Sequence, residues 1–385
     1  MALAGDTYCI FSANYFPSLG GVEKYTQSLA SELTSEGHGV CIVTNNVFGL
    51  CDHEVLANDV EIVRLPCRPL FGGRLPIPRP DDSYRRLVHD LKARDWRGVL
   101  VNTRFYPHSL LGVDVAVACG VKPIVCDHGS AYLTFGNKVA DVAVRGWEHA
   151  ITAMIKHRDA DFYAVAARSL EWLKTFGIEG KGVLSNSIDA TRYRKSASAR
   201  DFKSEFGVPA ENLLVSFIGR FIPEKGVGVL LEAMKSLSDR PISLLMAGDG
   251  PLRNQIEEAR LGNVKLVGRL DQPDVAALLQ QSDLYCLPSR SEGFSTSLLE
   301  ASACGTPALV TAVGGTDELI PDDSYGRVVR GSLNAGVLSG QLLLLENDRE
   351  GLRQMGCRAR DLVEKEYSWA QTAHAFVRAC ERANL

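Results

Sequence analysis

The sequence predicts an α/β protein made of two doubly wound domains, each with a parallel sheet covered by helices on both faces. Short, almost continuously apolar runs alternate with helix-length segments, as expected for strands that are buried on both sides. The alternation begins again in the second half of the chain. The length of 385 residues also exceeds what one hydrophobic core usually serves, so two domains are the default.

The predicted elements follow in chain order. In the first half, the strand-like runs are residues 7–12, 39–44, 60–65, 99–102 and 123–127, with helical spacing over residues 22–36. In the second half, they are residues 213–218, 242–247, 264–267, 284–287 and 308–310. The polar segment 190–200 shows no hydrophobic period and is interpreted as a linker. We therefore expect an N-terminal domain over residues 1–189 and a C-terminal domain over residues 190–367, facing each other across a cleft. The helical segment 368–385 is expected to pack back on the first domain.

The composition is that of an ordinary soluble enzyme or binding protein, with 23% charged and 45% hydrophobic residues. A net charge of −4 argues against a dedicated nucleic-acid binder, so no nucleic acid is expected as a partner. None of the ten cysteines forms a C-x-x-C pair, which favours buried thiols in a reducing cytosol over disulfides or a metal site. No apolar run is long enough to span a membrane, and no leader sequence is visible. We therefore expect a cytoplasmic protein.

The most informative stretch is residues 289–300, which follows one predicted strand and runs into a helix. Gly293 lets backbone approach a ligand, and Phe294 and Ser295 precede the helix, whose N–H groups can face an anion. Glu292 lies on the turn, whereas Glu300 projects from the helix about 6 Å further along its axis. That offset favours contacts with different parts of one long ligand over a glycosidase-type carboxylate pair. The alternative is that Glu292 only caps the helix and that Glu300 is a solvated surface residue.

The other candidate loops also follow predicted strands. Gly20 and Gly21 precede the first helix and form a possible anion site, although a tight turn is equally compatible and the dinucleotide motif G-x-G-x-x-G is absent. His128 directly follows a strand at the edge where parallel sheets bind ligands, and a loop histidine bonded to backbone is the alternative. In the second half, Arg220 and Lys225 share one loop and suit a diphosphate. The segments 247–251 and 267–270 end neighbouring strands.

Residues 64–104 form a basic region with an apolar, proline-containing first part, and ten Lys or Arg side chains stand against four Asp or Glu. Such a segment suits an acceptor that carries phosphate or lies at an anionic membrane surface. A long solvated loop without a binding role is the commoner explanation of this composition.

Taken together, these motifs resemble the retaining glycosyltransferases of family 4, also described as glycosyl transferases group 1, which have the GT-B fold of two Rossmann-like domains. The resemblance covers nearly the whole chain in the family's order. It is carried by Phe16-Pro-x-x-Gly-Gly21, His128-Gly129, Asn186-x-x-Asp189, Gly219-Arg-x-x-Pro-Glu-Lys-Gly226, Ala247-Gly-Asp-Gly-Pro251 and Glu292-Gly-Phe294, with seven residues between Glu292 and Glu300.

The resemblance implies a role for each matching residue. Arg220 and Lys225 would hold the diphosphate of a nucleotide sugar and stabilise it as a leaving group. Glu292 and His128 would contact the transferred sugar. The donor-binding set would comprise Gly20, Gly21, Asn186, Arg269, Leu270, Gly293, Phe294, Ser295 and Glu300, with Glu300 on the ribose and the backbone at Arg269 and Leu270 on the base. At Asn186 the sequence departs from the family, because Ser187 stands where glycine commonly follows.

The implied activity is transfer of a hexosyl unit from a UDP- or GDP-sugar to a hydroxyl of a glycan or lipid-linked acceptor, with retention at the anomeric carbon. The expected setting is synthesis of cell-envelope or capsular polysaccharide, or of another glycoconjugate, at the inner face of the membrane. No cofactor or metal is expected, because Arg220, Lys225 and the helix dipoles can supply the positive charge. An epimerase or phosphorylase of the same fold and a non-catalytic nucleotide-sugar-binding subunit remain as alternatives. The absence of the dinucleotide motif G-x-G-x-x-G disfavours a nicotinamide dehydrogenase.

Overall fold

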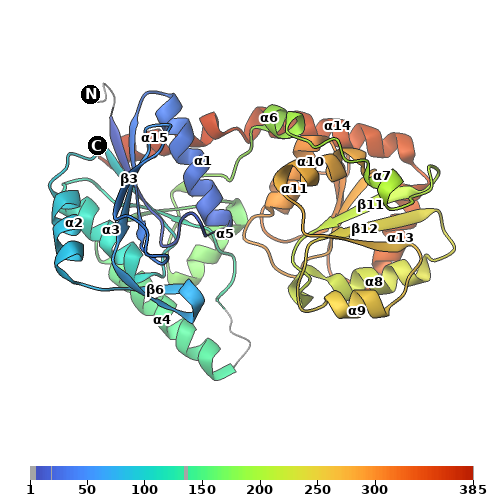
Figure 1. The fold of residues 1–385 in the computed structure, drawn as a ribbon, viewed down its shortest axis with the longest axis horizontal. Helices are drawn as coiled ribbons and strands as arrows, with labels where there is room; N and C mark the ends of the chain where they lie inside the picture. The colour runs from blue at the N-terminus through green and yellow to red at the C-terminus, as the bar shows by residue number, and fades with distance from the viewer. Residues whose placement is uncertain (1–5, 19, 134–137, 385) are drawn as a thin grey trace. The chain divides into compact units, whose positions relative to one another are not determined.

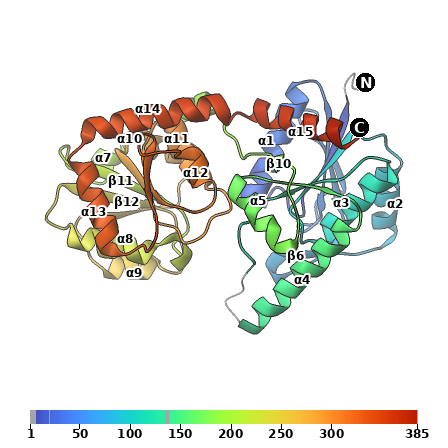
Figure 2. The ribbon, with the colours of Figure 1, turned by 180° about the vertical axis from the view of Figure 1, so that it is seen from behind.

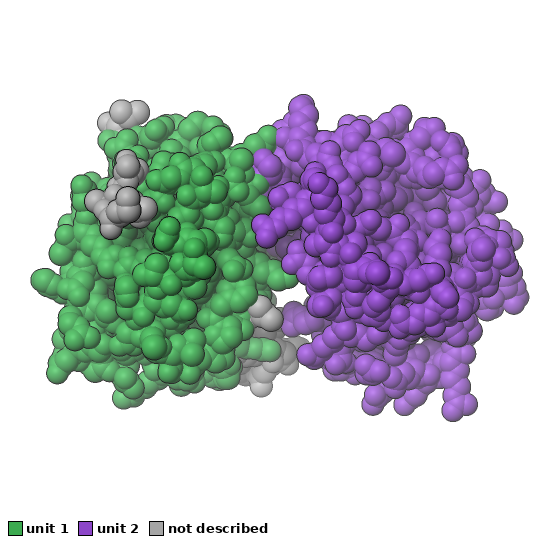
Figure 3. Space-filling model, turned by 45° about the horizontal axis from the view of Figure 1, so that its top comes forward, with its two compact units in different colours: residues 1–186, 369–385 green, residues 187–368 purple. Residues whose placement is uncertain are grey.

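The computed structural model describes residues 6–18, 20–133 and 138–384, with residues 138–140 described by their backbone alone. The chain divides into two compact units (Figure 3). Unit 1 comprises residues 1–186 and 369–385, and unit 2 comprises residues 187–368. The boundary therefore follows Asn186, whereas the predicted boundary follows Asp189.

Unit 1 has an eight-stranded sheet in the order β10-β9-β8-β7-β1-β2-β4-β3, parallel except for β3. Its strands are β1 (Thr7–Phe11), β2 (Gly39–Asn45), β3 (His53–Val55), β4 (Glu61–Leu65), β7 (Gly98–Asn102), β8 (Ile124–Asp127), β9 (Asp161–Ala164) and β10 (Gly182–Val183). A separate antiparallel hairpin consists of β5 (Cys67–Leu70), η1 (Phe71–Gly73) and β6 (Leu75–Pro78). The helices are α1 (Gly21–Ser35), α2 (Asp82–Lys92), α3 (Pro107–Ala118), α4 (Lys138–Lys156), α5 (Ala167–Leu173), η2 (Lys174–Phe176) and α15 (Trp369–Ala383).

Helices cover both faces of this sheet (Figure 1). The core lies on both faces because successive side chains of β1 point to opposite sides. Phe11 packs in a cluster with side chains of α2, α3 and α4. On the other face, Tyr8 meets the ring of Phe376 from α15 at 5.3 Å. The C-terminal helix α15 contacts α1 and belongs to unit 1, although the whole of unit 2 precedes it in sequence.

Unit 2 has a six-stranded, fully parallel sheet in the order β13-β12-β11-β14-β15-β16. Its strands are β11 (Leu213–Ile218), β12 (Ile242–Ala247), β13 (Val264–Gly268), β14 (Leu284–Leu287), β15 (Ala308–Thr311) and β16 (Gly326–Val329). Its helices are α6 (Ala190–Lys195), α7 (Phe202–Glu205), η3 (Pro223–Lys225), α8 (Val227–Ser236), α9 (Arg253–Glu258), α10 (Gln272–Gln281), α11 (Thr296–Cys304), α12 (Thr316–Leu319), α13 (Ala335–Glu346) and α14 (Arg349–Glu366). The helices α8, α9 and α13 lie on one face, and α7, α10, α11 and α14 lie on the other (Figures 1 and 2).

This strand order is that of a doubly wound dinucleotide-binding-type sheet, so the predicted α/β class with two Rossmann-like units is confirmed. The predicted linker is wrong for residues 190–195, which form α6. Asp189 caps this helix by accepting a hydrogen bond from Arg192 N at 2.9 Å. Ala190 and Tyr193 are buried in the core of unit 2. The helix is too short to show a hydrophobic period, which explains the error.

Candidate functional site

In unit 2, the predicted site residues gather where the order of the strands reverses. The chain leaves β11 toward β12 on one side and leaves the neighbouring β14 toward β15 on the other. The loops after these strands therefore diverge at the carboxyl edge, which is where open α/β sheets bind ligands. One loop carries Lys225 and the other carries Glu292, and Lys225 Nζ lies 2.5 Å from Glu292 Oε1.

This ion pair is largely shielded from solvent, with side-chain exposure of 21% for Lys225 and 10% for Glu292. The hydroxyl of Ser289 donates a second hydrogen bond to Glu292 Oε1 at 2.7 Å. Because an ammonium group has three N–H donors, Lys225 can hold Glu292 and still donate to an anion at the same edge. The carboxylate thus fixes the lysine without using all of its donors.

The backbone holds the two loops together. Gly226 has φ +71°, in the left-handed region that favours glycine. A β-carbon at this position would clash with the carbonyl oxygen of Pro288. Arg290 N donates to the carbonyl oxygen of Glu224 at 2.7 Å. Only glycine allows the loop that carries Lys225 to approach the other loop this closely.

The segment Gly293, Phe294 and Ser295 leads into α11, as predicted. Ser295 is the N-cap residue, and its Oγ accepts a hydrogen bond from Leu298 N at 3.3 Å. Phe294 packs its ring at 6.4 Å from that of Tyr367. The N-terminal N–H groups of α11 and its helix dipole make this end of the helix favourable for a negatively charged or hydroxyl-bearing ligand.

Glu300 is half-buried on α11, and its carboxylate affects the pKa of two tyrosines. Burial raises the pKa of Tyr285 well above its usual value, and the carboxylates of Glu292 and Glu300 raise it further. Burial likewise raises the pKa of Tyr193, with Glu300 as the next contribution. The negative charges of both glutamates therefore act on the hydroxyl of Tyr285. The hydroxyl of Tyr285 itself donates to Ser297 Oγ at 2.7 Å.

The remaining predicted residues of unit 2 follow β11 and β13. The side chain of Arg220 is exposed, and within the described residues its guanidinium makes no ion pair. Arg269 is 82% exposed, with Nε 3.3 Å from Asp249 Oδ2. Leu270 packs partly buried against a core cluster. Arg220 is therefore available to an anionic ligand, whereas Arg269 already has an acidic neighbour.

The turn after β12 packs closely against the backbone of a neighbouring loop. Gly248 and Gly250 have φ values of +141° and +156°. A β-carbon at Gly248 would clash with the carbonyl oxygen of Gly219, and one at Gly250 would approach the backbone of Phe221 to 2.7 Å. The glycines of this motif thus let the turn pack against the loop that carries Arg220.

In unit 1, Gly20 is the N-cap residue of α1 and Gly21 is its first residue. The carboxylate of Glu23 folds back toward Gly20, where a β-carbon would clash with it. Burial raises the pKa of Glu23, while hydrogen bonds from its own N–H and from Ser18 lower it. The N-terminus of α1, predicted as an anion site, therefore already has a carboxylate beside it.

His128 belongs to a chain of hydrogen bonds that was not predicted from the sequence. The hydroxyl of Thr26 donates to the carbonyl oxygen of Val22, so it accepts the hydrogen bond from Asn102 Nδ2 at 2.9 Å. The Oδ1 of Asn102 can then only accept, and it lies 2.9 Å from His128 Nε2. His128 therefore carries its proton on Nε2 and presents Nδ1 as an acceptor.

Burial lowers the pKa of His128 to about 3, so the imidazole is neutral at physiological pH. The ring of Tyr25 stands edge-on to that of His128 at 4.8 Å, and its hydroxyl donates to the carbonyl oxygen of Leu184 at 3.2 Å. Asn102 ends a predicted strand at the carboxyl edge, and that position is the signal that could have identified it. Asn186 is half-buried at the end of unit 1.

The structure thus brings together Lys225, Glu292 and the start of α11 in unit 2, with Glu300 close to Tyr285. In unit 1 it places His128, which directly follows β8, beside Asn102 at the end of the neighbouring strand β7. Within the described residues, no group of three or more His, Cys, Asp or Glu side chains is arranged to hold a metal ion. None of the helices described is long and apolar enough to cross a membrane.

Comparison with known proteins relates each half of the chain to a family. Residues 198–362 match the family model described as glycosyl transferases group 1. Residues 19–192 match the model described as glycosyltransferase family 4. An uncharacterized glycosyltransferase of Methanocaldococcus jannaschii is 23% identical over 393 residues, covering 97% of both chains. The N-acetyl-alpha-D-glucosaminyl L-malate synthase of Bacillus anthracis is 26% identical over 380 residues, covering 91% of both.

Solved structures show the same fold. A protein from Anabaena in complex with UDP superposes with a TM-score of 0.73 at 16% identity, covering 98% of this chain and 100% of the other. The two family models fall on the two units, and they agree with the strand orders of both sheets. The chain therefore belongs to the family 4 glycosyltransferases of the GT-B fold.

Proposed function

We propose that this glycosyltransferase moves a hexosyl unit from a UDP- or GDP-sugar to a hydroxyl group of a glycan or lipid-linked acceptor, with retention at the anomeric carbon and without a metal ion. The observation that carries the proposal is the Lys225–Glu292 pair, at 2.5 Å, where the strand order of unit 2 reverses. It supplies a fixed cation beside a carboxylate at the edge where such sheets bind nucleotides.

The chemistry follows from these groups. The bond between the anomeric carbon and the phosphate oxygen breaks first, and negative charge develops on the departing diphosphate. Lys225, Arg220 and the N-terminus of α11 stabilise that charge, because preorganised donors act most strongly where charge appears in the transition state. The acceptor hydroxyl attacks from the same face, and its proton passes to the departing phosphate oxygen.

The other site residues position the donor. Glu292 faces the ring hydroxyls of the sugar, and Glu300 accepts hydrogen bonds from the ribose. His128 is neutral and presents Nδ1 as an acceptor, so it suits a sugar hydroxyl that donates a hydrogen bond. The backbone at Arg269 and Leu270 contacts the base. Gly20, Gly21 and Asn186 complete the predicted donor-binding set.

We further propose that the β5–β6 hairpin brings the protein to an anionic membrane surface, where a lipid-linked acceptor would lie. Its tip exposes Leu70 and Phe71, by 45% and 64%. Arg68 and Arg74 flank this tip, both exposed, and neither takes part in an ion pair with a described residue. An apolar tip between exposed cations suits the boundary of anionic headgroups and acyl chains.

The test begins with the donor. The protein is heated with single UDP- and GDP-sugars, and the sugar that raises the melting temperature most is selected, because a ligand of the native state stabilises it by mass action. The UDP complex of the Anabaena neighbour makes UDP-sugars the first choice. Mass spectrometry then detects transfer to a panel of glycan and lipid-linked acceptors.

The outcomes separate the alternatives. Transfer with an anomeric NMR signal of the donor's configuration, unchanged by EDTA, supports the proposal. Inversion of configuration or loss of turnover with EDTA refutes the corresponding part of it. Conversion of the nucleotide sugar without an acceptor indicates an epimerase, and phosphate-dependent cleavage of a glycan indicates a phosphorylase. Binding without turnover over the whole panel indicates a non-catalytic subunit.

A further inference from the structure

Unit 1 contains a buried cluster of charged side chains that includes Asp127, the residue directly before His128. Arg104, Asp127 and Glu148 are each 1% exposed. Arg104 Nε lies 3.3 Å from Asp127 Oδ2, and Arg104 Nη2 lies 3.0 Å from Glu148 Oε2. Arg104 Nη1 donates to the hydroxyl of Thr152 at 3.1 Å, and the guanidinium lies 3.6 Å from the ring centroid of Phe176. The guanidinium of Arg104, which follows β7, therefore links the end of β8 to α4.

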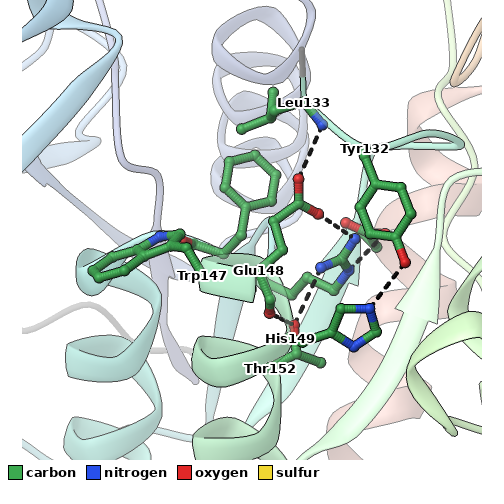
Figure 4. Close-up of polar contacts among 9 residues, drawn as sticks. Tyr132, Leu133, Trp147, Glu148, His149 and Thr152 are labelled. Carbon is green, nitrogen blue, oxygen red and sulfur yellow. Dashed lines mark hydrogen bonds and ion pairs between the residues drawn. The ribbon is translucent and has the colours of Figure 1, made fainter. Parts of the chain in front are cut away.

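This cluster also holds the segment that follows His128, residues 128–133. Leu133 N donates to Glu148 Oε1 at 2.9 Å, so one glutamate bridges this segment and Arg104 (Figure 4). Near the same end, the hydroxyl of Tyr132 lies 2.9 Å from His149 Nε2. The segment directly follows Asp127 in the chain and is bonded near its end by Glu148, and both carboxylates are held by Arg104.

The turn that presents Arg104 has an unusual backbone. Thr103 has φ +66°, a conformation that is costly for a β-branched residue and that persists only where the surroundings impose it. Thr103 N donates to the carbonyl oxygen of Cys126 at 2.8 Å, which ties the turn to β8. Because of this kink, Asn102 reaches the imidazole of His128 while Arg104 enters the buried cluster. Asn102 and Arg104 thus act on the segment from two sides, and Thr103 ties the turn between them to β8.

Stability alone does not account for this arrangement. One cation and two carboxylates leave the cluster with an excess of negative charge, and burying charge carries a large desolvation cost that well-packed apolar side chains would avoid. Burial raises the pKa of Asp127 to about 6, with Arg104 opposing the rise and Glu148 adding to it. The excess charge is therefore only partly compensated.

We propose that Arg104 is a positioning residue for the transfer reaction: through Asp127 and Glu148 it fixes residues 128–133, and so sets the place of the His128 imidazole against the sugar. This inference rests on the proposed function, because it takes His128 to contact the transferred sugar. A displacement of about 1 Å at a reacting centre can lower turnover by about 10²-fold.

The test replaces Arg104 by lysine, which keeps the charge but cannot reach three partners with one compact ammonium group. We expect Arg104→Lys to lower kcat by about 10²-fold, with the KM for the donor changed by less than about twofold, because the donor's diphosphate is held by unit 2. The matched control is Arg64→Lys. Arg64 is also buried in unit 1, 5% exposed, and it pairs with Glu54 at 2.6 Å.

A double-mutant cycle shows whether Arg104 acts through His128. On a His128→Ala background, Arg104→Lys is expected to lower kcat by no more than about twofold further, because residues that act as one unit are non-additive. Equal losses on both backgrounds, or a loss no larger than that of Arg64→Lys, overturn the proposal. Absence of any turnover in the unchanged protein refutes the proposed function instead, so the two failures are distinguishable.

A neutral variant separates positioning from folding. Arg104→Met, Asp127→Asn and Glu148→Gln combined leave no buried charge unpaired, so the melting temperature should be retained or raised. We expect this variant to fold and to lose turnover as Arg104→Lys does. Full turnover in the folded triple variant overturns the proposal. Failure of both this variant and Arg104→Lys to fold also overturns it, because the cluster would then serve folding.

Discussion

Lys225 illustrates how much a single side chain contributes at the residue scale. It forms an ion pair with Glu292 in a partly shielded position, where a charge acts more strongly than in bulk water. We predict that Lys225→Ala lowers kcat at saturating donor by about 10²-fold or more, the usual effect of removing one preorganised donor from a developing charge. Steady-state turnover measures this effect.

The control for this prediction is Lys235→Ala. Lys235 is an exposed lysine on α8 of the same unit, so its loss should leave kcat within about twofold, as for surface substitutions generally. A Lys225→Ala protein with unchanged kcat at saturating donor would remove Lys225 from the catalytic set.

Sequence reasoning located single residues well where they follow strands. Arg220, Lys225, Glu292 and His128 all lie in loops at a carboxyl edge, as the strand pattern predicted. The hydrogen-bond partners of these residues could not be predicted from the strand pattern. Asn102 and His128 are 26 positions apart, and only the register of β7 beside β8 brings them together. The positive φ of Thr103 leaves no signature in composition, because threonine rarely adopts it.

At the scale of elements, the contact between the loops after β11 and β14 depends on Gly226. We predict that Gly226→Ala lowers the melting temperature or abolishes folding, because the residue combines φ +71° with a β-carbon that would clash with the carbonyl oxygen of Pro288. Folded protein that remains should lose turnover, since the adjacent Lys225 must shift. Circular dichroism and turnover measure the two effects.

Gly228 provides the matched control two positions away. It lies inside α8, and a β-carbon there meets nothing within 4 Å. Gly228→Ala should therefore stabilise the protein by up to about 1 kcal/mol through helix propensity. Equal effects of the two substitutions would contradict the role given to the contact between the loops.

The β5–β6 hairpin gives a second prediction at this scale. Replacing Leu70 and Phe71 together by serine should reduce cosedimentation with vesicles of anionic phosphatidylglycerol by about tenfold or more, because each apolar side chain contributes about 1.5–3 kcal/mol when buried. Leu344→Ser is the control, since Leu344 is 66% exposed on α13 of unit 2. Binding that is lost equally in the control, or that is absent from anionic vesicles altogether, rejects the hairpin as the membrane contact.

The long buried strands and α11 were predictable because their apolar runs are continuous and bounded by glycine or proline. The hairpin and α6 were not. Prolines at positions 69, 76 and 78 disguise β5 and β6, which pair only with each other and need few ladder hydrogen bonds. The six residues of α6 are fewer than two full turns, so tertiary packing determines this helix.

At the scale of the whole molecule, the two units differ in how they respond to acid. All eight histidines lie in unit 1. Burial lowers the pKa of His108 to about 4 and that of His128 to about 3. The unfolded chain therefore binds protons more readily, and stability from these two groups falls as the pH drops through about 6.5.

The expected size of this effect can be estimated for pH 5. At about 1.4 kcal/mol per pH unit over the roughly 1.5 units below pH 6.5, each histidine costs about 2 kcal/mol. Asp127 acts in the opposite sense, because its pKa is raised to about 6. As the pH falls from 6 to 5, its protonation therefore increases the free energy of unfolding by about 1.4 kcal/mol. Unit 1 should thus lose on the order of 3 kcal/mol between pH 7.5 and pH 5.

Tryptophan fluorescence can follow this change in one unit, because Trp96, Trp147, Trp172 and Trp369 all lie in unit 1. We predict that acidification lowers the melting temperature seen by fluorescence more than that of any further transition seen by calorimetry. His89→Asn, at a histidine whose side chain is 84% exposed, should leave the shift unchanged. A fluorescence transition that does not move with pH would contradict the prediction.

The placement of α15 has a consequence for the growing chain on the ribosome. Unit 1 needs Phe376 and Cys380 of α15 in its core, and Phe376 packs against Tyr8 at the other end of the sequence. Residues 187–368 form unit 2 and are synthesised before α15. The unit whose sequence begins first is therefore the last to be completed. During translation the sheet of unit 1 keeps the surface for α15 uncovered until that helix has been synthesised. Unit 2 can complete its fold before then.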